Sequence, residues 1–348
     1  MRFAATLGCA ACLFALAAAA AESPAEADLR KARAQIEAAQ DGPARATGLV
    51  ALAQAHTRRA RESGDATQYE RSLEALAEAR RQDPAHAGLA KVEAWVRLGR
   101  HEFAAAEALA RAHCEAQPQD ADAWGLLGDA LMEQGRSDAA ADAYQRMMDL
   151  RPGPGAYQRA AYWRERAGDL DGAQALLRRT LAATAARDVE DRAWILVHVA
   201  ALEERAGDAA RAEATLREAL AQFADYHYAL AALAVLELRD GRAEQSLATS
   251  RRALAAAPHP ERRLVAADAL RALGREDEAR AEEDTFLREA LANQARADNE
   301  NLFLVDFFLD RRPDVPRALA IAEREASRRR DPATRERLER ARAAAEAN

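Results

Sequence analysis

Residues 121–152 read ADAWGLLGDALMEQGRSDAAADAYQRMMDLRP, and this stretch decides the fold of the 348-residue chain. Apolar residues recur three or four positions apart, as at Leu127 and Leu131, which is the spacing that lines one face of an α-helix. Gly135 interrupts the pattern at its middle, and Pro152 ends it. Because glycine permits tight turns and proline stops helices, the stretch predicts two helices of about 12 to 15 residues joined by a short turn.

The same arrangement recurs along the chain. Glycines followed by Asp or Arg return at intervals of 33 to 39 residues, and prolines follow four of them by about 17 to 20 residues. The glycines are Gly64, Gly99, Gly135, Gly168, Gly207, Gly241 and Gly274, and the prolines are Pro84, Pro118, Pro152 and Pro258. A fixed period of this length is typical of a repeat protein whose unit is a helix pair.

Composition supports an all-α fold. Aromatic residues are only 5% of the chain, charged residues are 31%, and Gly and Pro are few. An Ala-, Leu-, Glu- and Arg-rich chain of this kind favours helices and argues against all-β, collagen-like and disulfide-rich proteins. The regular Gly and Pro breaks also argue against one long coiled coil.

The quoted unit resembles the tetratricopeptide repeat in eight or more positions at fixed spacing. These positions are Trp124, Leu127, Gly128, Leu131, Gly135, Ala140, Tyr144, Met147 and Pro152. In such a repeat, the small residues Gly128 and Ala140 let the two helices approach closely. The resemblance implies a right-handed α-solenoid, in which the first helices of the units line a concave groove that usually holds a peptide or a partner's helix.

We expect about eight helix pairs. Residues 22–43 are predicted to form an N-terminal helical cap with a DGP linker at 41–43, residues 44–331 the solenoid, and residues 332–348 a charged capping helix. Solenoids need polar caps because their terminal units would otherwise expose an apolar face.

The family's groove-facing positions are the second, fifth, ninth, twelfth and thirteenth of each unit. Aromatic and Arg side chains at those positions are the candidate partner site: Arg97, Tyr162, Arg166, Trp194, Arg205, Tyr228 and Arg239. The aromatic residues are interpreted either as anchors for a bound chain or as packing between adjacent units. The four Arg residues, assigned to the thirteenth position, either bind carboxylates of an acidic partner or interact with the helix dipole at a helix end.

Residues 1–21, MRFAATLGCAACLFALAAAAA, have the pattern of a secretory signal peptide: Arg2, an apolar stretch, and small residues before Glu22. We therefore expect an exported protein that is periplasmic or secreted, with no membrane span after cleavage. A retained N-terminal anchor is the alternative. Cys9 and Cys12 lie in this segment, which leaves Cys114 as the one thiol of the mature chain, predicted to be buried.

Motifs for chemistry are weak in this sequence. Seven His residues form no metal-ligand pattern, and nucleotide-binding and nucleophile motifs do not occur. A net charge of −7 gives no reason to expect nucleic-acid binding. Asp169 begins a segment that resembles the start of a calcium loop, but it is better interpreted as a helix cap.

The sequence therefore predicts a non-enzymatic protein-interaction scaffold of the periplasm or cell envelope, without cofactor or metal. The alternative is a structural component of an envelope complex that self-associates or is anchored by an uncleaved N-terminus.

Overall fold

The computed structural model describes residues 23–295 and 300–347, and these residues form helices and turns with no strand. The predicted signal peptide lies outside the described residues. Within the described part, no helix is both long enough and apolar enough to cross a membrane.

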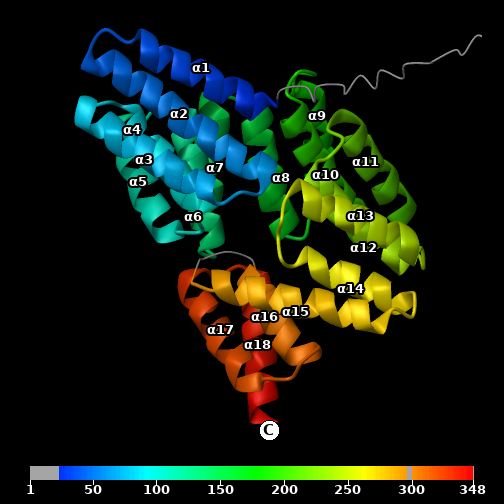
Figure 1. Ribbon diagram of the computed structural model, residues 1–348. Helices are drawn as coiled ribbons and strands as arrows, with labels where there is room; N and C mark the ends of the chain where they lie inside the picture. The colour runs from blue at the N-terminus through cyan, green and yellow to red at the C-terminus, as the bar shows by residue number, and fades with distance from the viewer. Residues whose placement is uncertain (1–22, 296–299, 348) are drawn as a thin grey trace, which may run out of the picture.

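Eight helix pairs stack as a right-handed α-solenoid between two terminal helices, which confirms the predicted fold class (Figure 1). The first helices are α2 (Gly42–Ser63), α4 (Gly88–Gly99), α6 (Ala121–Glu133), α8 (Pro154–Arg166), α10 (Val189–Arg205), α12 (His227–Arg239), α14 (Arg262–Ala272) and α16 (Glu300–Asp310). The second helices are α3 (Thr67–Gln82), α5 (Phe103–Ala116), α7 (Ser137–Leu150), α9 (Leu170–Ala183), α11 (Ala209–Gln222), α13 (Ala243–Ala256), α15 (Glu276–Asn293) and α17 (Val315–Arg328). The terminal helices are α1 (Pro24–Ala38) and α18 (Pro332–Glu346).

Each pair is held by small residues where its helices cross. In the α6–α7 pair, Ala140 is 0% exposed, and a methyl group added at Gly128 would overlap the Tyr144 ring. The Tyr144 hydroxyl donates a hydrogen bond to Asp129 at 3.0 Å, so this ring is polar at its tip and apolar along its body. The predicted packing role of Gly128 and Ala140 is therefore confirmed.

The six turns from α4–α5 to α14–α15 that lie inside pairs share one backbone pattern. At Gly135 φ is +73°, and the amides at this residue and the next donate to Met132 and Leu131 carbonyls. In the α4–α5 turn this left-handed position is occupied by His101, with φ of +56° and equivalent bonds to Leu98 and Arg97.

This finding corrects the register of one unit. Gly99, which was predicted to be the turn residue, is the last residue of α4, two positions before His101. A side chain at Gly99 would collide with the Tyr69 ring of α3, so this glycine permits close packing. Arg97 is consequently two positions earlier in its unit than predicted, and Gly99 stands at the thirteenth position.

Residues 41–43 (DGP), which were predicted to be a linker, form the N-terminal cap and first turn of α2. Asp41 accepts a hydrogen bond from the Ala44 amide at 2.8 Å and caps α2, while Gly42 and Pro43 form the first turn of that helix. Asp169 likewise caps α9 by accepting from the Gly172 amide at 2.8 Å, as predicted. Cys114 is buried, at 3% exposure, and burial raises the pKa of its thiol to about 11.

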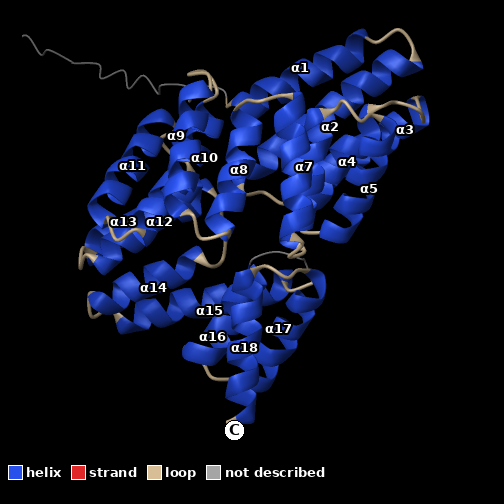
Figure 2. Ribbon diagram, turned by 180° about the vertical axis from the view of Figure 1, so that it is seen from behind, coloured by secondary structure: helices blue, strands red, loops and turns tan. Residues whose placement is uncertain are grey.

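The solenoid curves until units far apart in sequence touch (Figures 1 and 2). The end of α2 contacts the start of α10, and the Gly64 turn packs on Ala257 and His259 before α14. At the other end of the chain, the Arg330 amide donates to the Glu133 carbonyl of α6 at 3.1 Å. These contacts bring the N-terminal and C-terminal halves together.

Candidate protein-interaction surface

The row of arginines predicted at the thirteenth position is paired within the chain. Arg205 donates to Glu165 of the preceding unit at 2.6 Å, and Arg239 pairs with Glu204 in the same way. Each pair joins one first helix to the first helix before it. The side chains of Arg205 and Arg239 are 49% and 65% exposed, so such pairs contribute only about 0–1 kcal/mol each.

The other two arginines have different surroundings. The Arg166 guanidinium lies 5.8 Å from the centre of the Tyr162 ring, on its own helix. Arg97 forms ion pairs with Glu93 at 3.0 Å and Glu102 at 2.5 Å. Hydrogen bonding to Glu102 raises the pKa of Arg97. All four arginines therefore have intramolecular partners.

Tyr162 packs between adjacent units. Its hydroxyl donates to Glu133 of α6 at 2.8 Å, and its ring borders the apolar core of the α6–α7 pair. Burial and then the Glu133 carboxylate raise the pKa of this hydroxyl. For Tyr162 the contacts correspond to the packing interpretation.

Trp194 and Tyr228 are brought together across α10 and α12. Their rings meet edge to face with centroids 5.2 Å apart, and His198 lies 4.5 Å from Trp194. The third contact is unexpected, because the Arg61 guanidinium of α2 lies 5.8 Å from the centre of the Trp194 ring. Trp194, one of the two predicted groove aromatics, thus contacts a residue of the first unit.

Arg61 is held at this place by two carboxylates at the start of α10. Its Nη2 donates to Glu190 and, at 2.6 Å, to Asp191. Tyr226 orients Glu190 by donating to its other carboxylate oxygen at 3.0 Å. Burial by itself lowers the pKa of Arg61, but the charges of Glu190 and Asp191 outweigh this effect, and the pKa is raised overall.

The backbone of Arg61 is bound as well. Arg262 donates to His227 Nδ1 at 2.5 Å, so the ring proton lies on Nε2, which donates to the Arg61 carbonyl at 3.0 Å. Arg262 also donates to the carbonyls of Ala253 and Ala257. Burial, followed by the charge of Arg262, lowers the pKa of His227 to about 3 and keeps the ring neutral.

These residues form one site, which we call the Arg61 site: Arg61, Glu190, Asp191, Trp194, Tyr226, His227 and Tyr228. Of its members the sequence indicated only Trp194 and Tyr228. Glu190 and Asp191 precede Trp194 on the same helix, but no spacing signal links them to Arg61, which is 129 and 130 residues away.

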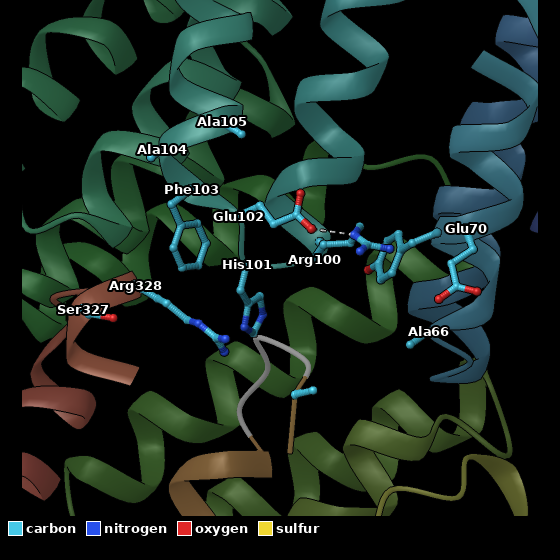
Figure 3. A pocket seen from close by; sticks show the side chains of 13 residues that line it. Ala66, Glu70, Arg100, His101, Glu102, Phe103, Ala104, Ala105, Ser327 and Arg328 are labelled. Atoms are coloured by element: carbon cyan, nitrogen blue, oxygen red, sulfur yellow. Dashed lines mark hydrogen bonds and ion pairs between the residues drawn. The ribbon is translucent and has the colours of Figure 1, made fainter. Parts of the chain in front are cut away.

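A cavity of about 640 Å³ lies elsewhere, between α3, the α4–α5 turn and the end of α17. Figure 3 shows His101 from the turn and Phe103 from the start of α5 facing Arg328 of α17, with Arg100 paired to Glu102 at 2.8 Å. Among the described residues, His101 Nδ1 is buried without a hydrogen-bond partner. Burial, and secondarily the charge of Arg329, lower the pKa of His101 to about 4. No group of His, Cys, Asp and Glu in the described ranges could hold a metal ion.

Comparison with known proteins identifies the repeat. A tetratricopeptide-repeat family model matches residues 121–154, the unit formed by α6 and α7. No curated protein sequence matches the chain significantly.

Solved structures share the fold at low sequence identity. A Cut9–Hcn1 structure from the APC/C hetero-tetramer superposes with a TM-score of 0.59 at 14% identity, covering 90% of this chain and 59% of the Cut9–Hcn1 chain. The present chain therefore spans about three fifths of that relative. An IFIT1 monomeric mutant with m7Gppp-AAAA has a TM-score of 0.57 at 14% identity, covering 86% of this chain and 71% of that chain. A human IFIT1 dimer with PPP-AAAA has a TM-score of 0.54 at 12% identity, covering 90% and 84%.

Because these neighbours are only 12–14% identical to the chain, they show the fold alone. The chain thus contains a tetratricopeptide repeat at residues 121–154, and its eight stacked helix pairs have the fold of tetratricopeptide-repeat solenoids.

Proposed function

We propose that this protein is an exported, non-enzymatic scaffold of the periplasm or cell envelope, which binds a peptide or a partner helix along its concave face. The fold supports an interaction role, and the signal-like residues 1–21 support export. The observation that carries the proposal is the Arg61 site, where carboxylates and aromatic rings of two neighbouring first helices gather at one place.

Crosslinking from defined positions tests where a partner binds. Ala201 is exposed on the first helix α10, and Ala214 is exposed on the second helix α11. A photoreactive residue at Ala201 should crosslink to one specific envelope protein in living cells, while the same residue at Ala214 should not. Equal crosslinking from both positions, or crosslinks only between copies of this chain, would support the structural, self-associating alternative.

The N-terminus of the purified protein separates export from anchoring. A chain that begins at Glu22 and fractionates with the periplasm supports an exported scaffold. A chain that begins at Met1 and fractionates with the membrane supports the anchored structural component.

An acidic partner is the second hypothesis for the concave face, carried by the row of Arg166, Arg205 and Arg239. The pairs with Glu165 and Glu204 already supply carboxylates to two of these cations, so an acidic partner would have to replace them. Replacing all three with Gln should lower stability slightly, by about 0.3–1 kcal/mol per position, if the row serves helix ends and unit-to-unit pairing. Loss of partner affinity together with its salt dependence would instead support an acidic partner.

A further inference from the structure

We propose that Glu190, Asp191 and Trp194 form a recognition site for an arginine side chain of the partner, and that Arg61 occupies this site in the free protein. The inference rests on the proposed function, because it places the partner on the concave face. It names the partner's chemistry: a segment that presents an arginine, and not an acidic one.

The site has the chemistry that recognises a guanidinium group. Two carboxylates, Glu190 and Asp191, accept hydrogen bonds from the same guanidinium nitrogen, Nη2, and the centre of the Trp194 ring lies 5.8 Å from the guanidinium carbon. Arginine is the cation that both forms multiple hydrogen bonds to carboxylates and stacks on aromatic rings. A lysine ammonium would satisfy the charge but would lose the planar contact with the indole.

The site is also preorganised on elements that do not include Arg61. Glu190 is 3% exposed and is fixed by Tyr226, while the edge contact from Tyr228 and the neighbouring His198 hold Trp194. All of these residues lie on α10, α12 or the residue before α12. Since a buried carboxylate is costly without a cation, Glu190 favours a cation supplied from outside these elements.

Arg61 is an imperfect occupant. It belongs to α2, and 29% of its side chain remains exposed, whereas Arg262 beneath it is 6% exposed. Within the described part of the chain, Arg61 Nε is buried and has no hydrogen-bond acceptor. The Arg61 Nε donor therefore makes no hydrogen bond to any described residue. Because part of the Arg61 side chain is exposed to solvent, a competing arginine can reach the site.

Exchange of the occupant would open the molecule. α2 contacts α10 and α12 through the Arg61 ion pairs, the Arg61 guanidinium over Trp194 and the hydrogen bond from His227 to the Arg61 carbonyl, and the next turn packs on His259. A partner arginine that takes the carboxylates removes the main attraction at this contact. Binding and separation of the two halves are then one coupled equilibrium.

The direct test uses a small guanidinium probe on the full mature chain. Arg61→Ala should vacate the site, and N-acetyl-arginine amide at millimolar concentration should then raise its melting temperature. The wild type should not respond, because its site is filled. N-acetyl-citrulline amide, which has the same shape without the charge, should have no effect on either protein.

Two controls make the test specific. Arg58→Ala removes an arginine of the same helix that pairs with Asp28 at 2.6 Å, and this variant should behave like the wild type. Arg61→Ala combined with Glu190→Gln should lose the response to N-acetyl-arginine amide. If Arg61→Ala responds no more than Arg58→Ala, or responds equally to the citrulline compound, the arginine site is wrong.

A second measurement keeps the inference testable if Arg61→Ala folds poorly. Arg61→Lys keeps a cation at the contact between α2 and α10 but loses the planar guanidinium. If this contact, which we call closure, hides the site in most wild-type molecules, the variant should increase the Ala201 crosslink to the partner by about tenfold. Glu190→Gln in the same background should abolish that gain. A partner that crosslinks from Ala201 with equal yield in all variants would retain the proposed function and overturn this inference; no crosslink in any variant would count against both.

Discussion

At the residue scale, the crossing of α6 and α7 is limited by the size of Ala140. Its side chain is 0% exposed and lies in a core with Leu127 and Tyr144. Ala140→Leu should lower the free energy of unfolding by about 1–3 kcal/mol, because the added carbons have no space. Ala214→Leu, on the exposed face of α11, is the matched control and should leave stability nearly unchanged. Equal melting curves for both variants would contradict the assigned packing.

The backbone at His101 permits a second test. Its φ of +56° disfavours residues with a Cβ, so His101→Gly should be more stable than His101→Ala by about 1 kcal/mol. At an ordinary helical position the order is reversed, since Ala exceeds Gly in helix propensity. Chemical denaturation of the two variants decides between the registers. An advantage for Ala would restore Gly99 as the turn residue.

The residues also show how far sequence reasoning reaches. The roles of Gly128, Ala140 and Tyr144 follow from local spacing, because their contacts lie within one helix pair. The register of the α4–α5 unit was predicted wrongly from Gly99. This glycine lies two positions before the turn and permits close packing on Tyr69, while His101 adopts the turn conformation. Spacing alone cannot separate these two uses of glycine.

At the element scale, α18 covers the last unit. Leu338 and Ala341 pack on the core formed by α16 and α17, and Arg340 pairs with Asp306 and Asp310 at 2.8 Å. A chain that ends at residue 331 should expose this apolar core and should aggregate, as solenoids without a polar cap do. Light scattering during size-exclusion chromatography measures the effect.

Arg340→Ala is the control for the truncation, because it removes exposed ion pairs and keeps the cap. It should remain monodisperse and lose less than about 1 kcal/mol. If the truncated chain is as monodisperse as this variant, α18 is not a cap.

At the scale of the whole molecule, the sequence predicted the stack of helix pairs but not the closure, which is the contact between units far apart in sequence. Units contact their neighbours through local patterns, so eight pairs could be counted from Gly, Pro and apolar spacing. Closure depends on small rotations summed over several units, and it is fixed by contacts such as Arg61 with Asp191, 130 residues apart. No local sequence pattern predicts the contact between Arg61 and Asp191. Consequently Trp194 and Tyr228 could be singled out as candidates from their positions in the repeat, whereas Arg61, which lies over the Trp194 ring, could not.

Three of the histidines that lie where the two halves meet have lowered pKa values, and together they make the stability of the folded protein sensitive to pH. Burial and then the charge of Arg61 lower the pKa of His198 to about 4. Burial, Arg262 and His259 lower the pKa of His227 to about 3, although its bond to the Arg61 carbonyl opposes this. His101 has a pKa lowered to about 4 by burial and Arg329, which Asp331 opposes.

These shifts fix the sign of the pH dependence. In the unfolded chain the three rings take up protons near their ordinary pKa of 6.5, while in the folded protein they stay neutral until about pH 4 or below. The unfolded state therefore binds more protons between pH 6.5 and 4, and stability is lost as the pH falls through this range. Each histidine should lower the free energy of unfolding by about 1–2 kcal/mol between pH 7 and pH 5.

Urea denaturation at pH 7 and pH 5 measures this loss of stability, and His198→Gln should reduce it relative to the wild type. Stability that does not change between pH 7 and pH 5 would mean that these rings are more accessible to solvent than their burial implies.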